Sequence, residues 1–329
     1  MIKKIMSIFL VLSLALLMVA PGAMASAKKA WPTKKLTIVV PTRPGGTADR
    51  ISRGMAPHLS KEFGVPVVIE NRPGGNSVVG TAAHLKSDPD DGSYILLSTS
   101  PMFEANTLFD VPYKIEDLDY IAVIAWDSLG IFVHKDSQIK TLEQLFDAIK
   151  ANPSKLKYSD VPFSWGQVVM SIIEKEVLNS TAVRIPFQRG GANPRAMLLG
   201  RHVDFLPAPY RGTMAAIGTD ARCLGISKHE PSSPEIPLIA DVARKYNPNI
   251  TFPEVIFMRH LDIKKSFRKK HADSWNLMVE TVKGLFDDAA FQEWNKKSGM
   301  GLSWIDPQDS EKLVYENKEL ISKHADVFK

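Results

Sequence analysis

The sequence predicts an α/β protein of two domains, each with a largely parallel sheet covered by helices. Apolar runs of strand length alternate along the chain with helix-like segments, which is the pattern of repeated βα units. The 329 residues, 44% of them hydrophobic, are enough to bury two cores. Cys223 is the only cysteine, so no intrachain disulfide can form and stability must come from burial.

The amino terminus has the three parts of a secretory signal peptide. Two lysines precede an apolar run over residues 5–20, and alanines flank Met24. The run is shorter than the roughly 20 residues that a spanning helix needs, although an uncleaved anchor is the alternative. We therefore expect residues 1–25 to be removed, a mature start at Ser26 or Lys28, and a protein free in the periplasm.

The strand candidates follow one another at regular places after the signal. The clearest are LTIVV at 36–40, VPVVI at 65–69 and YILLS at 94–98. Later candidates lie in LKYSDV, AVRIPF, HVDFLP and RCLGIS, and a short one covers 302–305 in an otherwise helical region after residue 262. Continuous apolar runs of this length are typical of strands covered on both faces.

Composition and motifs argue against several functional classes. The net charge of +5 includes the two signal lysines, so the mature chain is only mildly positive and no nucleic-acid partner is expected. The sequence contains no phosphate-binding or dinucleotide-binding glycine motif, no nucleophile elbow and no zinc-hydrolase histidine pair. The Ser-x-x-Lys match at 266–269 lies in a charged helical segment and has no partner motifs. We expect no cofactor, no metal and no catalytic residues. A hydrolase or lyase of small organic acids, or a ligand-sensing partner of a signalling receptor, remain the alternatives.

Two glycine-rich turns are the most informative motifs. Pro44-Gly45-Gly46 and Pro73-Gly74-Gly75 each follow a strand and precede a helix. A glycine pair lets a ligand approach the backbone, and a helix start supplies free amides and a positive dipole end. Each motif by itself could simply form a tight turn with no role in binding. Together, at the same edge of a parallel sheet, they predict a shared site for a carboxylate or phosphate.

The motifs PTRPGGTADR, ENRPGGNSVVG, DGSYILLSTS and PFQRGGANPRAMLLGRHVDF resemble the tripartite tricarboxylate transporter receptors, also called TctC-like or Bug proteins. The resemblance covers nearly the whole mature chain. It implies a two-lobed, type II-like Venus-flytrap fold that binds a di-, tri- or aromatic carboxylate, as a monomer, and passes it to membrane permease subunits. It also implies that lobe one comprises residues 28–127 and 252–329, with lobe two at 128–251.

The family pattern, transferred residue by residue, places ligand-binding positions in four segments. They are Gly45, Gly46, Thr47 and Asp49 in the first loop, Gly74, Gly75, Asn76 and Ser77 in the second, and Ser164, Trp165 and Gly166 in lobe two. Thr99 and Ser100, after the third strand, are further candidates as hydroxyl donors. Alternatives stay open: Asp49 could stabilise the helix start, the two hydroxyls could cap a turn, and Trp165 could be core.

Three departures from the family pattern leave the identity of the ligand open. Arg43 stands where relatives carry a small apolar residue or proline, and it could bind a carboxylate through two hydrogen bonds or point into solvent. The segment with Arg189 and Gly190 is one residue longer than usual. Tyr210 and Arg211 follow an altered strand tip and would suit a ligand with an apolar or aromatic body and a second acidic group.

Overall fold

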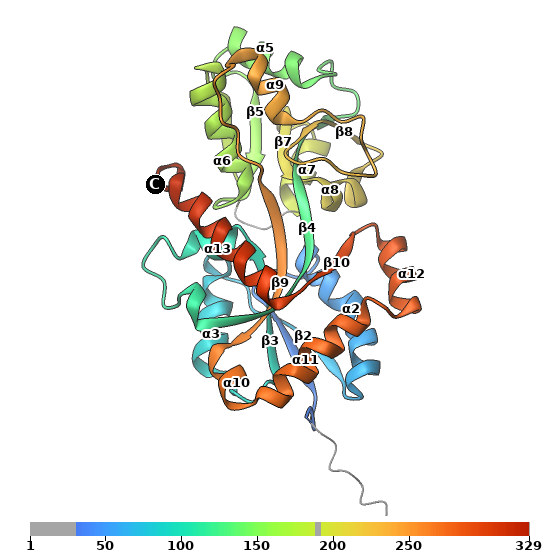
Figure 1. The fold of residues 1–329 in the computed structure, drawn as a ribbon. Coiled ribbons are helices and arrows are strands. Elements are labelled where there is room, and N and C mark those ends of the chain that lie inside the picture. The colour runs from blue at the N-terminus through green and yellow to red at the C-terminus, as the bar shows by residue number, and fades with distance from the viewer. Residues whose placement is uncertain (1–30, 188–191, 329) are drawn as a thin grey trace, which may run out of the picture.

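The structure is a computed structural model that describes residues 31–187 and 192–328. Figure 1 shows two lobes, one above the other, with the strands β4 and β9 running between them. The strands are β1 (Leu36–Val40), β2 (Val67–Asn71), β3 (Tyr94–Ser100), β4 (Leu118–His134), β5 (Lys157–Asp160), β6 (Val183–Pro186), β7 (Phe205–Pro209), β8 (Ala221–Ile226), β9 (Ile256–Lys264) and β10 (Leu302–Ile305).

Helices cover both faces of the sheets. They are α2 (Thr47–Phe63), α3 (Val78–Ser87), α4 (Met102–Asn106), α5 (Leu142–Ala151), α6 (Trp165–Ile172), α7 (Ala192–Leu199), α8 (Tyr210–Ile217), α9 (Ile239–Tyr246), α10 (Lys265–Lys270), α11 (Ala272–Leu285), α12 (Ala289–Ser298) and α13 (Pro307–Lys323). Within the described residues, no helix has the length and apolar character needed to cross a membrane.

Lobe one is built on the strand order β2-β1-β3-β9-β4, with β10 beside β4. Strands β1, β2 and β3 are parallel, so the loops that follow β1 and β2 leave the sheet at the same edge. Strand β1 is fully buried, and α2 packs on it through Ile51, Met55 and Leu59. This packing fixes the start of α2 at the sheet edge.

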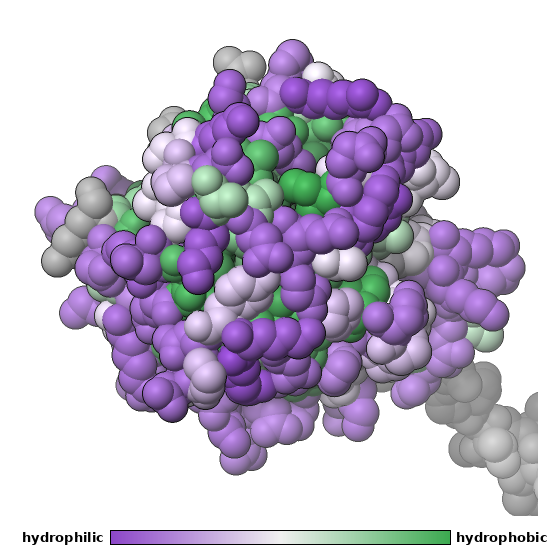
Figure 2. Space-filling view, turned by 90° about the horizontal axis from the view of Figure 1, so that it is seen from above, coloured by the Kyte–Doolittle hydropathy of each residue, from purple (hydrophilic) through white to green (hydrophobic). Residues whose placement is uncertain are grey.

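Lobe two contains the parallel strands β5, β6 and β7 and the antiparallel β8. Its core includes the buried side chains of Phe146, Trp165 and Phe205. The surface seen from above in Figure 2 is mainly hydrophilic, with hydrophobic residues in small separate areas.

Strand β4 runs from one lobe into the other. Strand β4 pairs with β9 from Leu118 to Ser128 and with β7 from Leu129 onward. We therefore propose the lobe boundary near residues 127–128, and a return near 251–252 before β9.

The structure confirms the predicted two-lobed α/β fold. The expected strands at 36–40 and 302–305 have the observed bounds of β1 and β10. Strands β4 and β9 were not among the candidates picked from the sequence, since their long apolar runs contain charged residues such as Asp127 and Arg259. The predicted signal peptide lies outside the described residues.

Candidate functional site

A cavity lies between the lobes, with about 130 Å³ open to the centres of water-sized molecules. Lobe one contributes the loop after β1, Thr99 and Met102. Lobe two contributes Asp160, Val161, Phe163 and Ser164, together with residues of α7 and the end of β7. Strand β9 adds Phe257 and Arg259. A second, more open hollow adjoins it and shares Thr42, Arg43, Met102, Val161 and Phe163 with it.

The first glycine-rich loop lines the inner cavity through Arg43, Gly46 and Thr47. Asp49 lies behind it: its carboxylate accepts a hydrogen bond from the Gly45 amide (2.9 Å) and from Arg53 Nε (3.0 Å). Burial alone would raise the pKa of Asp49, but these donors hold it below its ordinary value. Gly45 and Asp49 do not line the cavity, and their contacts support the helix-stabilising alternative.

The start of α2 leaves amides for a ligand. Thr47 is the first residue of α2, and amides in a first helical turn have no intrahelical acceptor. Gly46 precedes it with an extended backbone and no side chain, so the approach to these amides is open. Arg43 is exposed and lines both hollows, which places it at the junction between them.

The second loop lines the outer hollow with Gly74, Gly75, Asn76 and Ser77. All four have positive φ: 143°, 51°, 54° and 80°. Successive backbone amides in a turn of this kind can form a concave surface that suits an anion. Asn76 also reaches across the cleft, where its side-chain amide donates to the Pro162 carbonyl of lobe two at 3.4 Å.

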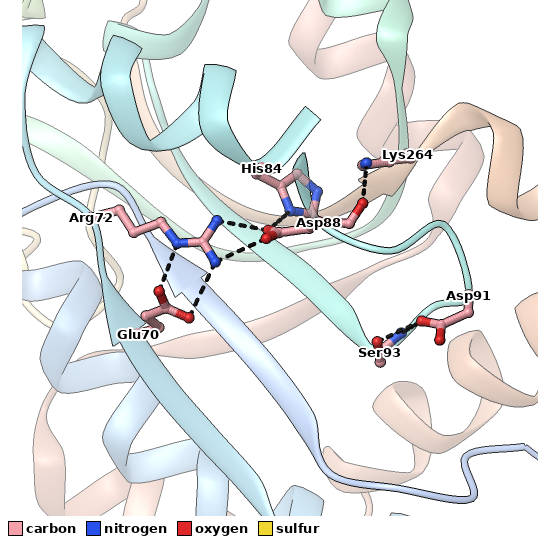
Figure 3. A network of polar contacts seen from close by, with 7 residues as sticks. All are labelled: Glu70, Arg72, His84, Asp88, Asp91, Ser93 and Lys264. Carbon is pink, nitrogen blue, oxygen red and sulfur yellow. Dashed lines mark hydrogen bonds and ion pairs between the residues drawn. The ribbon is translucent and has the colours of Figure 1, made fainter. Parts of the chain in front are cut away.

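An arginine at the base of the second loop fixes its position (Figure 3). Arg72 donates to Asp88 (2.7 Å) and to Glu70 (2.8 Å), and Asp88 also contacts His84 (3.0 Å). Lys264 donates to the Asp88 carbonyl at 2.6 Å. The hydrogen bond to Glu70 is the largest contribution raising the pKa of Arg72. The arginine of the second motif is therefore a structural clamp.

The two hydroxyls at the end of β3 have different surroundings. Thr99 lines the cavity, whereas Ser100 is fully buried and donates to Glu104. Strand β3 continues to Ser100, and side chains alternate between the two faces of a strand. Ser100 therefore points away from the predicted ligand.

Ser100 belongs to a buried arrangement that superficially resembles a catalytic triad. Its hydroxyl lies 3.2 Å from His260 Nε2, and His260 Nδ1 lies 2.6 Å from Asp262 Oδ1. Each of the three side chains is completely buried. Because they do not line the cavity, these groups have no access to a substrate there. Among the described residues, no cluster of histidine, cysteine and acidic side chains is suited to a metal.

In lobe two, Ser164 lines the cavity, whereas Trp165 and Gly166 do not. Trp165 is fully buried, and its indole donates to the Ile256 carbonyl at 2.7 Å, as the core alternative predicted. A side chain on Gly166 would meet the Pro207 carbonyl at 3.0 Å, so this glycine permits close packing of α6 on β7.

Aromatic side chains close the cleft beside Ser164. Phe163 lines both hollows, and its ring centre lies 5.2 Å from that of Phe109 in lobe one. The ring centre of Phe328, beyond α13, lies 5.5 Å from that of Phe163. The hydrogen bond from Gln167 Nε2 to the Val327 carbonyl (2.6 Å) also joins the C-terminal segment to α6. The structure therefore shows the lobes in contact around the cavity.

Tyr210 and Arg211 do not line the inner cavity. Tyr210 stacks on Phe132 and its hydroxyl pairs with Ser233 (2.6 Å). Arg211 pairs with Glu230 (2.8 Å), donates to the Gly301 carbonyl of lobe one (3.2 Å) and lies 4.5 Å over the ring of Trp126. These contacts explain both side chains without a ligand. Arg189 and Gly190 lie outside the described residues.

Besides Arg43, two arginines that the sequence did not predict line the cavity. Arg195 on α7 and Arg259 on β9 are each 5% exposed, and both line the cavity. Burial, together with the nearby positive charges of Arg50 and Arg259, lowers the pKa of Arg195 to about 10. Burial also lowers the pKa of Arg259. For Arg259, the available signal was a charged residue within the largely apolar run of β9.

The charge of Asp127 acts on both of these arginines. It is buried on β4 and accepts from the Arg211 amide (2.7 Å) and the Gly212 amide (3.0 Å) at the start of α8. Burial raises its pKa to about 6, against the influence of these amides and of Arg259. Asp160, which also lines the cavity, is already paired with Arg184 at 2.9 Å.

A cavity between two α/β lobes, with a strand that runs from one lobe into the other, is typical of the class of two-lobed solute-binding proteins. A family model described as tripartite tricarboxylate transporter family receptor matches residues 51–321, and the chain belongs to this family. The family consists of solute receptors rather than enzymes.

Curated relatives and solved structures support the assignment of the chain to this family. A UPF0065 protein from the tcbD-tcbE intergenic region of Pseudomonas sp. (strain P51) is 26% identical over 70% of this chain and 69% of its own. Protein BugT of Bordetella pertussis is 31% identical over 39% of this chain and 40% of its own.

The solved structures show the same fold at low sequence identity. Rpa4515 of R. palustris with adipate has a TM-score of 0.77 at 21% identity, covering 91% of this chain and 98% of its own. MatC from Rhodopseudomonas palustris with bound malate has a TM-score of 0.72 at 18% identity, over 91% and 100%. The periplasmic binding protein BugD has a TM-score of 0.73 at 23% identity, over 90% and 99%.

Proposed function

We propose that this chain is a periplasmic receptor that binds a small organic carboxylate and delivers it to the membrane subunits of a tripartite tricarboxylate-type transporter. The observation that carries the proposal is the start of α2 at Thr47, which opens into a cavity enclosed by both lobes. A helix start binds a carboxylate through its free amides and the positive end of its dipole.

Further support comes from relatives and from the amino terminus. Two structures with the same fold contain the carboxylates adipate and malate. The lysines and apolar run before residue 25 agree with export to the periplasm. We also propose that the receptor works as a monomer, since ligand capture needs only the two lobes of one chain.

A thermal-shift screen of the purified mature protein against organic acids tests the proposal. A ligand that binds only the folded state stabilises it by about 2.7 kcal/mol at a concentration one hundred times its Kd. We expect a carboxylate to raise the melting temperature and to be recovered unchanged after incubation. Consumption of the ligand, or no stabilisation by any carboxylate, would contradict the proposal. Matching uncharged amides serve as ligand controls.

A further inference from the structure

We infer that the C-terminal segment Ala325–Phe328 forms a clasp, which fastens lobe one to lobe two and stabilises the closed cleft before any ligand binds. The clasp consists of this segment and of Phe163 and Gln167 of lobe two, which it contacts. The inference goes beyond the proposed function, because it concerns the equilibrium between open and closed lobes in the ligand-free protein.

The first argument is the course of α13, which begins on lobe one and ends against lobe two. In its first turn, the hydroxyl of Ser310 accepts a hydrogen bond from the Val123 amide of β4 at 2.6 Å. Val314 packs in the same lobe-one cluster as Phe103. Ile321, near the end of the helix, is fully buried in the cluster that forms the core of lobe two. Figure 1 shows this end of α13 at the level where the lobes meet.

The second argument is the pair of hydrogen bonds made by the side chain of Gln167 on α6. Its Oε1 accepts from the Phe163 amide at 3.1 Å, and its Nε2 donates to the Val327 carbonyl at 2.6 Å. A side-chain amide suits this position because it accepts with one atom and donates with the other. Gln167 is 9% exposed, so water has little access to compete for these bonds. It therefore ties the end of the chain to Phe163, which lines the cavity.

The third argument is the apolar contact around Phe163. Its ring lies edge-on to that of Phe109, at an interplanar angle of 73°, and is tilted by 36° against that of Phe328. Apolar burial and aromatic pairing both favour the closed arrangement. The ion pair between Lys175 and Asp326 adds little, since both side chains are more than half exposed. Every partner in the clasp belongs to the chain itself, so these contacts need no bound ligand.

The clasp has a consequence for ligand capture. A ligand that binds the closed state best loses apparent affinity in proportion to the fraction of molecules that are open. By stabilising the closed state in advance, the clasp reduces this loss. It also has to release before a ligand can enter or leave through the side of the cleft at Phe163, so its strength affects the rates of both steps.

The test measures the distance between the lobes in the full-length mature protein without ligand. Spin labels on Lys86→Cys in α3 of lobe one and Lys150→Cys in α5 of lobe two, both exposed positions, report this distance by pulsed electron paramagnetic resonance. Cys223→Ser removes the native thiol from the labelling reaction. We expect most molecules with an intact clasp to show the short distance of the closed cleft.

Two substitutions weaken the clasp in different ways. Gln167→Glu keeps the oxygen that accepts from the Phe163 amide but replaces the donor to the Val327 carbonyl with a second oxygen. We expect it to lower the ratio of closed to open molecules by about tenfold, because that carbonyl loses its donor and faces a carboxylate. Phe328→Ala should lower the ratio by about threefold or more, because an aromatic pair is lost.

Matched controls leave the clasp intact. Gln144→Glu is the same substitution at an exposed position of lobe two, where the side-chain oxygen accepts from the Lys140 amide. Tyr315→Ala removes an aromatic ring that is 37% exposed on the same helix as the clasp. Both should leave the distance distribution unchanged.

The inference would be overturned by equal distance distributions in the intact protein and in both clasp variants, or by an intact protein that is fully open without ligand. A lower melting temperature with unchanged distances would show that the segment only stabilises the fold. If Gln167→Glu does not fold, Phe328→Ala at the half-buried chain end provides the test. No ligand is used, so a failure of the proposed function in the carboxylate screen leaves this result independent.

Discussion

The two glycine-rich loops share a sequence motif but differ in conformation and in place. In the first loop only Gly45 has positive φ, at 84°, and the chain enters the 17-residue helix α2 directly. In the second, positive φ runs from Gly74 to Ser77 before α3 begins. The first lines the inner cavity, whereas the second lines the outer hollow and touches lobe two. The same motif therefore provides a helix start in one place and a contact across the cleft in the other.

The largest effect on binding should come from the first loop. Gly46→Val should weaken carboxylate binding by about 3 kcal/mol, because the side chain would block two charge-assisted hydrogen bonds to the start of α2. The fold should tolerate it, since φ is −71° and a Cβ would lie 3.6 Å from its nearest neighbour. Calorimetry and denaturation of the same preparation measure both quantities.

Gly284→Val is the matched control for this variant, because a Cβ at Gly284 on α11 has nothing within 4 Å. Unchanged affinity in Gly46→Val would mean that the helix start does not hold the ligand, and the distinction between the loops would fail.

The sequence motif predicts both loops but not this difference between them. A Pro-Gly-Gly sequence after a strand indicates an open backbone, and that is what both loops have. Whether a helix starts at once depends on Asp49, which bonds the Gly45 amide, and on Arg72, which ties the second loop to Asp88. These contacts involve partners that a local pattern does not reveal.

The same limit applies to the other site residues. Thr99 and Ser100 were treated alike because strand β3 was expected to end at Ser98, whereas it continues to Ser100 and turns the two hydroxyls to opposite faces. Arg195 and Arg259 come from separate elements and meet only in the folded protein. Local patterns predicted the elements, and the missed residues are those whose role depends on tertiary contacts.

The second loop should respond to substitution mainly through stability. Gly75→Val places a β-branched residue at φ 51°, and a strained backbone of this kind lowers the free energy of unfolding by about 2 kcal/mol. Ligand affinity should fall by less than in Gly46→Val. Urea denaturation measures the first quantity. A variant as stable as the wild-type protein, with abolished binding, would reverse the roles assigned to the two loops.

A smaller effect, a pH dependence of ligand binding, should arise next to the first loop. Asp127 lies beside it: a Cβ on Gly212 would be 3.4 Å from Thr47 Oγ1 and 3.6 Å from Asp127 Oδ2. The pKa of Asp127 is raised to about 6 from 3.8, so its contribution to stability is greatest below the lower value and is lost as pH rises through the higher one. A bound anion favours the protonated form further, so ligand binding takes up a proton.

If the ligand raises this pKa by about one, affinity should increase by about sixfold as the pH falls from about 7.5 to about 5.5. Asp127→Asn should remove most of this dependence and bind more tightly at the higher pH, because a negative charge beside the cavity is gone. Calorimetry at both pH values, with a ligand that stays ionised, gives the comparison. A slope that persists in Asp127→Asn would assign the proton to another group.

The position of Trp126 provides an optical reporter of lobe motion. Its half-buried indole lies on β4, with the guanidinium of Arg211 at 4.5 Å and the ammonium of Lys228 at 5.8 Å from the ring centre. Arg211 belongs to α8 of lobe two and also donates to Gly301 of lobe one, so a rotation of one lobe against the other must change its place over the ring. The emission of this tryptophan should therefore change as the cleft opens, and stopped-flow fluorescence could follow ligand capture without any added dye.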